Sequence, residues 1–390
     1  MRAVPLVMRY GLSNALVLAF IAALVYGGWP IWTVLVLAAL TGGVIDETVG
    51  DDGGEISGRG WAFVEANLYA TLPLLAVMTW LLLGYVASAA AGQSGAGASA
   101  LIAAVLGTGY FYALTGVTVA HELTHRVTNP LALICARILL AFTLNPTFES
   151  YHVLGHHRDV CTYDDAATAR RGEYVLAFMV RTVVHQSIQG WRLEAERLDR
   201  KGFGAWSLRN RVLAGIACSA AIAIAAVLVA GPVGLAAFLA AAACGRVLHE
   251  MMNYVQHYGI VRPEGAPIEP RHAWDSNRLV SNALFYNLPR HADHHQFAGK
   301  PFWTLEAPAE SPKLPYGYQT MSLISLVPGW WHRTIDPLLA DWDRRLASEA
   351  ERSLVRERGW TIEMSQPARV GMTVPDRALE CGHDGRTPRR

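Results

Sequence analysis

Six long apolar blocks, almost free of charged residues, constrain the fold of this 390-residue chain more than any other feature. Each is close to the roughly 20 residues that a helix needs to cross about 30 Å of hydrocarbon. Only 17% of the residues are charged, whereas about 25% is usual in a soluble domain. The sequence therefore predicts an all-α integral membrane protein with about six transmembrane helices, at residues 11–28, 31–45, 66–88, 99–120, 211–230 and 232–251.

The distribution of basic residues predicts the orientation of these helices. The links near residue 29, across residues 89–98 and near residue 231 contain no Lys or Arg, whereas the opposite side receives most of the arginines. Lys and Arg are enriched in cytoplasmic loops, so both termini and a histidine-rich cap of helices and loops are expected in the cytoplasm, at a bacterial inner (plasma) membrane. Residues 346–390 are expected to form a cytoplasmic C-terminal tail.

Shorter segments give further expectations. The acidic, glycine-containing stretch at residues 46–52 is expected to be a solvated turn. Residues 131–144 are apolar but too short to span, so we expect them to be re-entrant or interfacial. Residues 191–198 and 336–358 read as amphipathic helices.

Nine of the 14 histidines fall into four compact groups that predict a metal site. In the first group, HELTH, His121 and His125 are four residues apart and so lie on one face of a helix. Read alone, this HExxH pattern is typical of a zinc protease. The other groups are His152 with the doublet His156 and His157, the single His257, and His291 with the doublet His294 and His295.

The number of grouped histidines predicts two metal ions rather than one. Four ligands complete a tetrahedral ion and six an octahedral one, so nine imidazoles exceed the needs of a single ion. Neighbouring residues on a helix point about 100° apart, so each His-His doublet is suited to two adjacent ions. Imidazole ligands leave zinc, copper, iron and nickel open. The net charge of +1 gives no support for nucleic-acid binding.

Carboxylates that accept the outer ring N–H groups are expected around such a site, because an all-nitrogen ligand set leaves the charge of the ions unbalanced. The candidates are Glu122, Asp159, Asp164, Asp165, Glu250, Asp275 and Asp293. His272, close to His257 in sequence, is a further candidate. Each of them alone is equally consistent with an ordinary surface or loop residue.

The histidine groups resemble the HxxxH, HxxHH or HxxxHH, and final HxxHH boxes of the membrane-bound fatty acid desaturase and hydroxylase superfamily. More closely, the chain is similar to the integral-membrane alkane 1-monooxygenases over roughly residues 10–345. The matching stretches are HELTHR from 121, GHHRDVCTYDDAATARRGE from 155, NYVQHYG from 253, WDSNRLVSN from 274 and LPRHADHH from 288. Tyr151, Gln256 and Arg126 depart from the Glu, Glu and Lys usual there, and Gln256 and Arg126 are more like the hydroxylase component of xylene monooxygenase.

This resemblance implies a function. Residues 1–345 would form a desaturase-like domain whose nine grouped histidines bind two non-haem irons, which activate O2 and place one oxygen atom in a terminal C–H bond of an alkane. The alternative is a hydroxylase component of a xylene or alkylarene monooxygenase. A fatty acyl desaturase, and an intramembrane zinc protease with Glu122 as the base, fit the motifs less well.

The electrons for such a reaction are expected from a separate protein, because the chain has no dinucleotide fingerprint and no four-cysteine iron site. The resemblance implies a rubredoxin or ferredoxin-type donor with its reductase. Five basic residues are candidates for its docking face: Arg170, Arg171, Arg197, Arg200 and Lys201. The bias of basic residues toward the cytoplasmic side explains them equally well.

Overall fold

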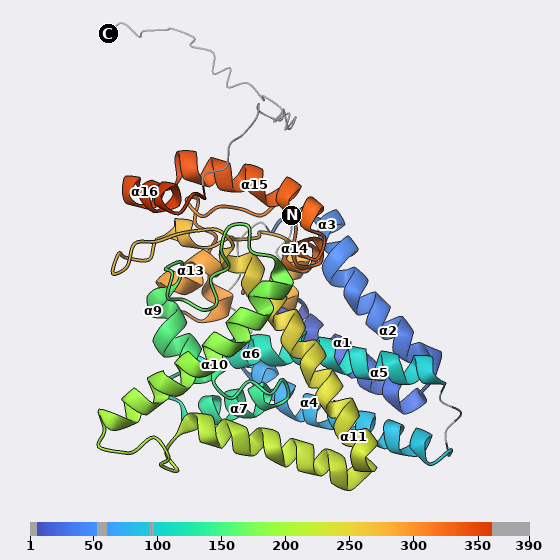
Figure 1. The fold of residues 1–390 in the computed structure, drawn as a ribbon. Helices are drawn as coiled ribbons and strands as arrows, with labels where there is room; N and C mark the ends of the chain where they lie inside the picture. The colour runs from blue at the N-terminus through green and yellow to red at the C-terminus, as the bar shows by residue number, and fades with distance from the viewer. Residues whose placement is uncertain (1–5, 53–60, 94, 96, 361–390) are drawn as a thin grey trace, which may run out of the picture.

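The computed structural model describes residues 6–52, 61–93, 95 and 97–360 (Figure 1). This part of the chain is built from helices joined by loops, the longest of which connect α9 to α10, α11 to α12 and α13 to α14. The helices, in order, are α1 Leu6–Tyr26, α2 Trp29–Leu40, α3 Asp46–Val49, α4 Trp61–Ala90, α5 Ala98–Phe111, α6 Thr118–Thr124, α7 Pro130–Ala141, α8 Phe148–Tyr151, α9 His157–Asp159, α10 Val175–Asp199, α11 Arg211–His257, α12 Leu279–Leu284, α13 His291–Gln296, α14 Tyr318–Ser325, α15 Pro328–Arg345 and α16 Glu349–Glu357. Two π-helical turns, Tyr112–Val117 and His152–His156, lie directly before or within histidine groups.

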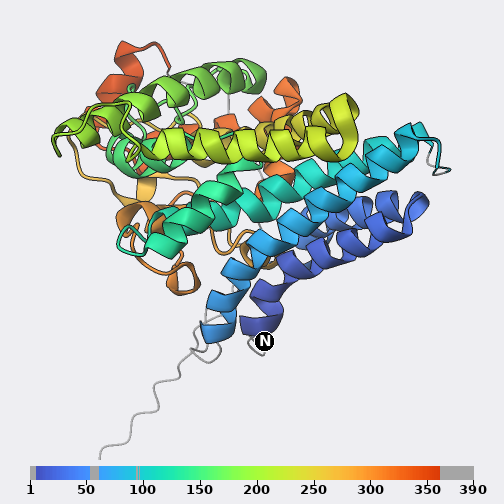
Figure 2. The same cartoon turned by 90° about the horizontal axis from the view of Figure 1, so that it is seen from below.

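Five helices within the described ranges are long and apolar enough to cross a membrane, and the prediction of an all-α integral membrane protein is confirmed. They are Met8–Tyr26, Trp29–Val49, Trp61–Ala90, Ala98–Thr124 and Arg211–His257. Figure 2 shows them side by side, from dark blue α1 and α2 to yellow α11. The first four correspond to the first four predicted spans; the first ends two residues earlier than predicted, and the other three end later.

The last two predicted spans are joined in the single 47-residue helix α11. Its helical geometry fails at Ala230 and Gly231, where Gly231 has a φ of 62°. Glycine tolerates this left-handed backbone, and Pro232 cannot donate a hydrogen bond to the preceding turn. The helix therefore bends sharply, and its two arms diverge from that point (Figure 1).

The second arm of α11 packs closely against α5 through two glycines. A Cβ atom on Gly109 would lie 2.6 Å from the carbonyl oxygen of Ala241, and one on Gly245 would lie 3.0 Å from the carbonyl oxygen of Gly109. Small residues permit such close backbone approach between membrane helices. Each helical segment continues twelve residues beyond its glycine, to His121 and to His257. The crossing thus brings two of the histidine groups to the same end of the bundle.

The shorter elements cover that end of the bundle (Figure 1). The apolar segment expected to be too short to span forms α7, and the amphipathic stretch at residues 191–198 is part of the longer α10. The prediction of a single helix at residues 336–358 is wrong, because the helix is interrupted between α15 and α16. Ser348 caps the start of α16 by accepting a hydrogen bond from the Glu351 N–H. Residue 345, the predicted domain boundary, ends α15, and the expected tail begins with α16; residues 361–390 lie outside the described part.

The acidic stretch at residues 46–52 is not the solvated turn that we expected. Asp46 is fully buried and accepts hydrogen bonds from the backbone N–H of Ser281 at 2.9 Å and from its hydroxyl at 2.5 Å. Asp52 lies between Arg9 and Arg290, 2.5 Å from each. Because Arg290 directly precedes α13, this N-terminal segment helps to fix the third histidine group in space.

Candidate metal centre

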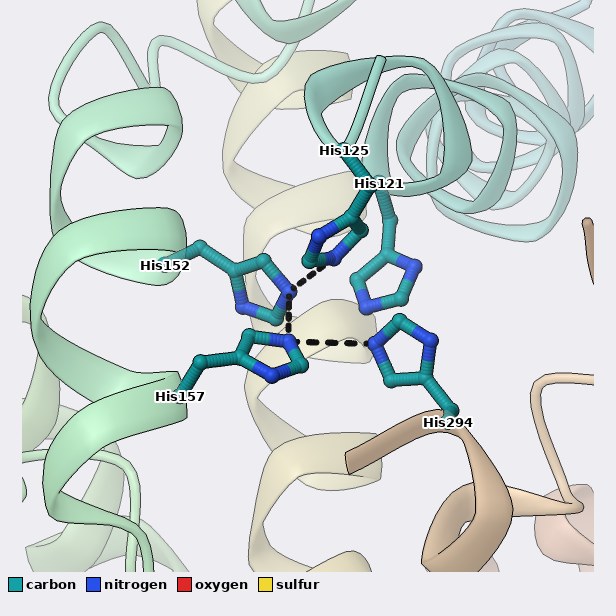
Figure 3. Close-up of side chains that lie close together, drawn as sticks. All are labelled: His121, His125, His152, His157 and His294. Carbon is teal, nitrogen blue, oxygen red and sulfur yellow. Dashed lines mark hydrogen bonds between the residues drawn. The ribbon is translucent and has the colours of Figure 1, made fainter. Parts of the chain in front are cut away.

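The first cluster joins five of the predicted histidines from three separate segments (Figure 3). One ring nitrogen from each lies within 4.8 Å of the others, and the members are His121, His125, His152, His157 and His294. The Nε2 atom of His152 is 3.0 Å from that of His125 and 3.1 Å from that of His157. The Nε2 atoms of His157 and His294 are also 3.1 Å apart. The rings therefore converge from α6, from the α8–α9 segment and from α13.

The second cluster contains the other four predicted histidines, which are all buried: His156, His257, His291 and His295. The Nε2 atom of His291 lies 3.0 Å from that of His257 and 3.1 Å from that of His295. Both doublets are divided between the clusters, because His157 and His294 belong to the first cluster and His156 and His295 to the second. The two clusters therefore lie side by side, as two adjacent ions would require.

These short contacts between ring nitrogens have the geometry of rings that share a metal ion. The Nδ1 atom of His257 lies 3.1 Å from the carbonyl oxygen of His272. That oxygen can only accept, so Nδ1 carries the ring proton and Nε2 presents a lone pair toward His291. A metal ion bound about 2.1 Å from two nitrogens at a right angle would place them about 3 Å apart. The spacing, the all-nitrogen set and the neutral rings fit ions bound by imidazole.

Three rings outside the membrane spans, those of His125, His157 and His295, are neutral at neutral pH. Burial and the neighbouring His156 lower the pKa of His125 to about 3. Burial and nearby imidazoles also place the pKa values of His157 and His295 well below the usual value. A neutral imidazole is the form that binds a metal ion, because protonation removes the lone pair.

Asp165 makes the contact expected of a carboxylate behind a metal-binding ring. It accepts from Nδ1 of His156 at 3.0 Å, from the Thr168 hydroxyl at 2.6 Å and from the Tyr151 hydroxyl at 2.5 Å. Burial opposes its ionisation, but His156 and these hydrogen bonds outweigh that effect and hold the pKa of Asp165 below its usual range. Sequence reasoning missed the roles of Thr168 and Tyr151, although Tyr151 stands out in the sequence as a departure from the resemblance.

Three other candidate carboxylates pair with cations instead of histidine rings. Glu122 lies 3.2 Å from Arg126, Asp159 lies 2.6 Å from Arg158, and Asp293 lies 2.7 Å from Lys300. Each basic partner is within seven residues in sequence, so the local charge pairing satisfies the carboxylate. The Glu122 carboxylate is thus occupied by an ion pair.

The remaining candidates support the centre indirectly or face away from the rings. Asp275 accepts from the backbone N–H of Ala292 at 2.8 Å and so anchors the first turn of α13. His272 contributes its carbonyl oxygen to His257, as described above, and not its ring. Glu250 forms an ion pair with Arg246 at 2.8 Å, and Asp164 accepts from Gln189 through its backbone carbonyl.

A cavity extends from both histidine clusters between α5, α11 and α14. Its wall is mainly apolar, and its histidine end includes His121 and His152 of the first cluster with His156 and His291 of the second. The rest of the lining comes from Tyr110, Ala113, Leu114, Val117, Thr118, Phe148, Leu248, His249, Met252, Asn253, Gln256, Phe285, Leu288, Gln319 and Ser322. An apolar cavity with few polar groups at one end is suited to a small hydrophobic ligand.

The five basic residues considered for partner docking do not form one free surface. Arg171 is buried, with its guanidinium 2.7 Å from Asp343 and 2.7 Å from the carbonyl oxygen of Gly259. Arg197 pairs with Glu194 at 2.6 Å. Arg170 lies over the Tyr163 ring at 4.1 Å. Arg200 and Lys201 are exposed at the C-terminal end of α10, so of the five residues only these two remain candidates for contact with a partner protein.

Comparison with known proteins agrees with this arrangement. Alkane 1-monooxygenase 2 of Pseudomonas aeruginosa is 36% identical over 238 residues, which cover 60% of this chain and 63% of that protein. An alkane 1-monooxygenase of Acinetobacter baylyi is 34% identical over 231 residues, 57% of this chain and 56% of its own length. The xylene/toluene monooxygenase hydroxylase component XylM of Pseudomonas putida is 29% identical over 262 residues, 66% of this chain and 71% of its length.

The chain thus spans less than two thirds of the length of these two alkane 1-monooxygenases. A model of the fatty acid desaturase family matches residues 96–325, a range that makes up more than half of the chain and contains all nine clustered histidines. The chain therefore belongs to the fatty acid desaturase family.

Proposed function

We propose that this protein is a membrane-bound diiron monooxygenase of the alkane 1-monooxygenase type, which converts the terminal methyl group of an apolar hydrocarbon to a primary alcohol. The observation that carries the proposal is the pair of histidine clusters at the end of one apolar cavity. The overall reaction joins a hydrocarbon, O2, two electrons and two protons to give the alcohol and water. The similarity to proteins named alkane 1-monooxygenase supports the same activity.

The nine clustered histidines would hold the two irons, five on one ion and four on the other. When bound, the irons would supply the activation of O2. The chain itself would fix the rings: Asp165 orients His156 through its Nδ1 atom, and the carbonyl oxygen of His272 orients His257. Such outer contacts set the tautomer and direction of a metal-binding imidazole.

The cavity would bind and align the substrate without a charged group. Leu114 and Val117 from the α5 side face Leu248 and Met252 from α11 around the same space. These side chains exclude water and bury the alkyl chain, at about 0.8 kcal/mol for each methylene group. Because the histidines lie at one end, the terminal carbon of a linear chain would be the part placed against them.

An alkylarene is the second candidate substrate class. The similarity to the xylene/toluene monooxygenase hydroxylase component favours it, and so does Gln256 in the cavity wall at a place where alkane 1-monooxygenases usually have Glu. A zinc protease is less well supported, because Glu122 is paired with Arg126 instead of being free to act as a base.

We also propose that electrons come from a rubredoxin or ferredoxin-type donor with its reductase. Arg200 and Lys201, the exposed pair at the end of α10, are the proposed docking residues. Charge reversal at both positions is expected to slow reduction by the donor most at low salt, because screening weakens the attraction between exposed charges. Equal reduction rates for variant and wild type at every salt concentration would refute this docking site.

The orientation proposed for the chain places the histidine clusters and both termini in the cytoplasm of a bacterial inner membrane. The basis is the absence of Lys and Arg from the links at residues 27–29, 91–97 and 230–233, set against the arginine-rich segments beyond the histidine ends of the spans. Labelling of single cysteines placed in these links, from outside intact cells, would test it.

Elemental analysis of the detergent-purified protein is the first test of the function. Two irons per chain, followed by hydroxylation of octane in the presence of donor and reductase, are the expected results. His156→Ala is expected to abolish turnover while the protein stays in the membrane, because it removes a member of the second cluster. One zinc without iron, or full activity of that variant, would refute the proposal; faster turnover of xylene than octane would select the alkylarene class.

A further inference from the structure

The carbonyl oxygen of His272 is the contact that holds His257 in the second histidine cluster. His257 donates to it from Nδ1 at 3.1 Å, and the Cys161 thiol donates to the same oxygen at 2.9 Å. His257 is fully buried, so the direction of its ring depends on this hydrogen bond and on packing. Whatever fixes the position of His272 therefore also acts on His257.

The ring of His272 is held from both sides. Its Nε2 atom donates to Glu351 at 2.7 Å, and its Nδ1 atom accepts from the backbone N–H of Glu269 at 2.9 Å. The side chains of His272 and Glu351 are each only 1% exposed. The carboxylate of Glu351 is thus the only charged group among the described residues that bonds this ring, and it is shielded from competing water.

Glu351 belongs to the C-terminal helix α16, outside the range 96–325 that matches the family. The same carboxylate accepts from Arg271 at 3.0 Å, one residue before His272. From the adjacent helix α15, the Trp342 indole donates to the carbonyl oxygen of Arg271 at 2.7 Å. Helices α15 and α16 therefore both hold Arg271, and the carbonyl group of the next residue, His272, orients His257.

We propose that Glu351 is a positioning residue for the second histidine cluster, acting through His272 on the ring of His257. The inference rests on the proposed function in one respect, namely that this cluster binds a metal ion. It gives the C-terminal helix a role in the centre that the family match does not include. Removal of groups that orient a metal-binding imidazole typically lowers metal affinity by about 10- to 100-fold.

The test compares metal release from the full-length, iron-loaded protein in detergent, with a chelator in excess. In Glu351→Ala, one of the two irons is expected to leave about 10- to 100-fold faster than in wild type, while the other keeps its wild-type rate. Mössbauer spectra before chelation are expected to show a change at one of the two iron sites. A purely structural role in packing α16 would not select one iron.

Two control variants lie on the same helix. Ser348→Ala removes the hydroxyl that caps α16 but leaves the contact between Glu351 and His272. Glu349→Ala removes an exposed carboxylate that pairs with Arg352 and Arg356. Both are expected to release iron at the wild-type rate. Selective loss of one iron from Ser348→Ala as well would overturn the proposal, because helix capping would then explain the effect.

The conservative variant Glu351→Gln keeps a hydrogen-bond acceptor for His272 but loses the charge. It is expected to release one iron faster than wild type and more slowly than Glu351→Ala, and it replaces the Ala variant if that protein fails to reach the membrane. Two irons in wild type and unchanged release from the Glu351 variants would refute this inference alone. A wild-type protein that holds no pair of ions would refute the proposed function and this inference with it.

Discussion

Ala113 offers a way to shorten the cavity at a known distance from the histidines. It lines the cavity eight residues before His121, which corresponds to about 12 Å along a helix that rises 1.5 Å per residue. Carbon–carbon bonds of about 1.5 Å give an extended alkyl chain roughly 1.3 Å per carbon, so octane spans about 9 Å and dodecane about 14 Å. A phenyl ring at position 113 is therefore expected to exclude the end of dodecane but not octane.

The size of the effect follows from the methylene groups that lose their burial. Dodecane extends about 2 Å, or roughly two groups, beyond the new ring, and each group is worth about 0.8 kcal/mol, so the cost is about 1.6 kcal/mol, a factor on the order of 15 in kcat/KM. In Ala113→Phe, kcat/KM for dodecane is expected to fall by about this factor relative to octane. Val117 lies only four residues, or about 6 Å, before His121. In Val117→Phe, activity toward octane is therefore expected to be lost together with activity toward dodecane.

The assay is competition between octane and dodecane in one reaction, with the two alcohols separated by gas chromatography. Leu106→Phe is the matched control, because this α5 residue is 41% exposed and is absent from the cavity lining. It places the same phenyl ring on the helix that leads to the cavity but outside the cavity lining, and it is expected to leave the product ratio unchanged. An unchanged ratio in Ala113→Phe, or an equal change in Leu106→Phe, would show that the substrate does not lie along α5.

Three further predictions concern the residues that support the centre. Asp52→Asn leaves Arg9 and Arg290 buried without their shared carboxylate and is expected to lower stability by about 3–5 kcal/mol, seen as a lower Tm in detergent; an unchanged Tm contradicts the ion-pair argument. Asp165→Asn is expected to weaken binding of one iron by about 10- to 100-fold in chelator titrations, and equal affinity would exclude its role. Burial opposes ionisation of Glu351, but bonds from His272, the Ser348 N–H and Arg271 outweigh it and place its pKa at about 2, below the usual 4.5. The stabilisation of the fold by the ionised Glu351 carboxylate is therefore fully present above about pH 4.5 and is lost as the pH falls toward about 2. The difference in Tm between wild type and Glu351→Gln is expected to narrow over that range and to stay constant at higher pH.

The apolar blocks were sufficient to predict the membrane bundle, and the grouped histidines named the nine residues that gather in the two clusters, but not which histidine belongs to which cluster. The division of the doublets followed from the angle between neighbouring helical residues, even though His152–His156 forms a π-helical turn. Both of these signals are local, because hydropathy and helical angle depend on residues close together in the chain. The interruption at Gly231 was also visible as a Gly-Pro pair, and the helical geometry of α11 fails at that point.

The carboxylates that support the centre could not be selected from sequence, because their partners are distant. Asp46 and Ser281 are 235 residues apart, and Glu351 and His272 are 79 apart. Asp165 was one of seven acidic candidates with no local feature to separate it from the others. Local ion pairs explain why other candidate carboxylates do not contact the histidine rings. Glu122 and Arg126, for example, are four residues apart, a spacing that favours an ion pair on a helix.

The arrangement of the clusters implies that metal binding and packing of the two ends of the chain are coupled. The third histidine group is tied to the N-terminal region through Arg290, Asp52 and Arg9, while His257 is tied to the C-terminal helix through His272 and Glu351. An ion bound by His257 and His291 would join these two networks, whereas the glycine crossing of α5 and α11 lies twelve residues before the histidines on each helix. Binding free energy gained only in the folded state adds to folded-state stability. The loss of the ion is therefore expected to loosen the segments around α13 and α16 before it affects the membrane helices.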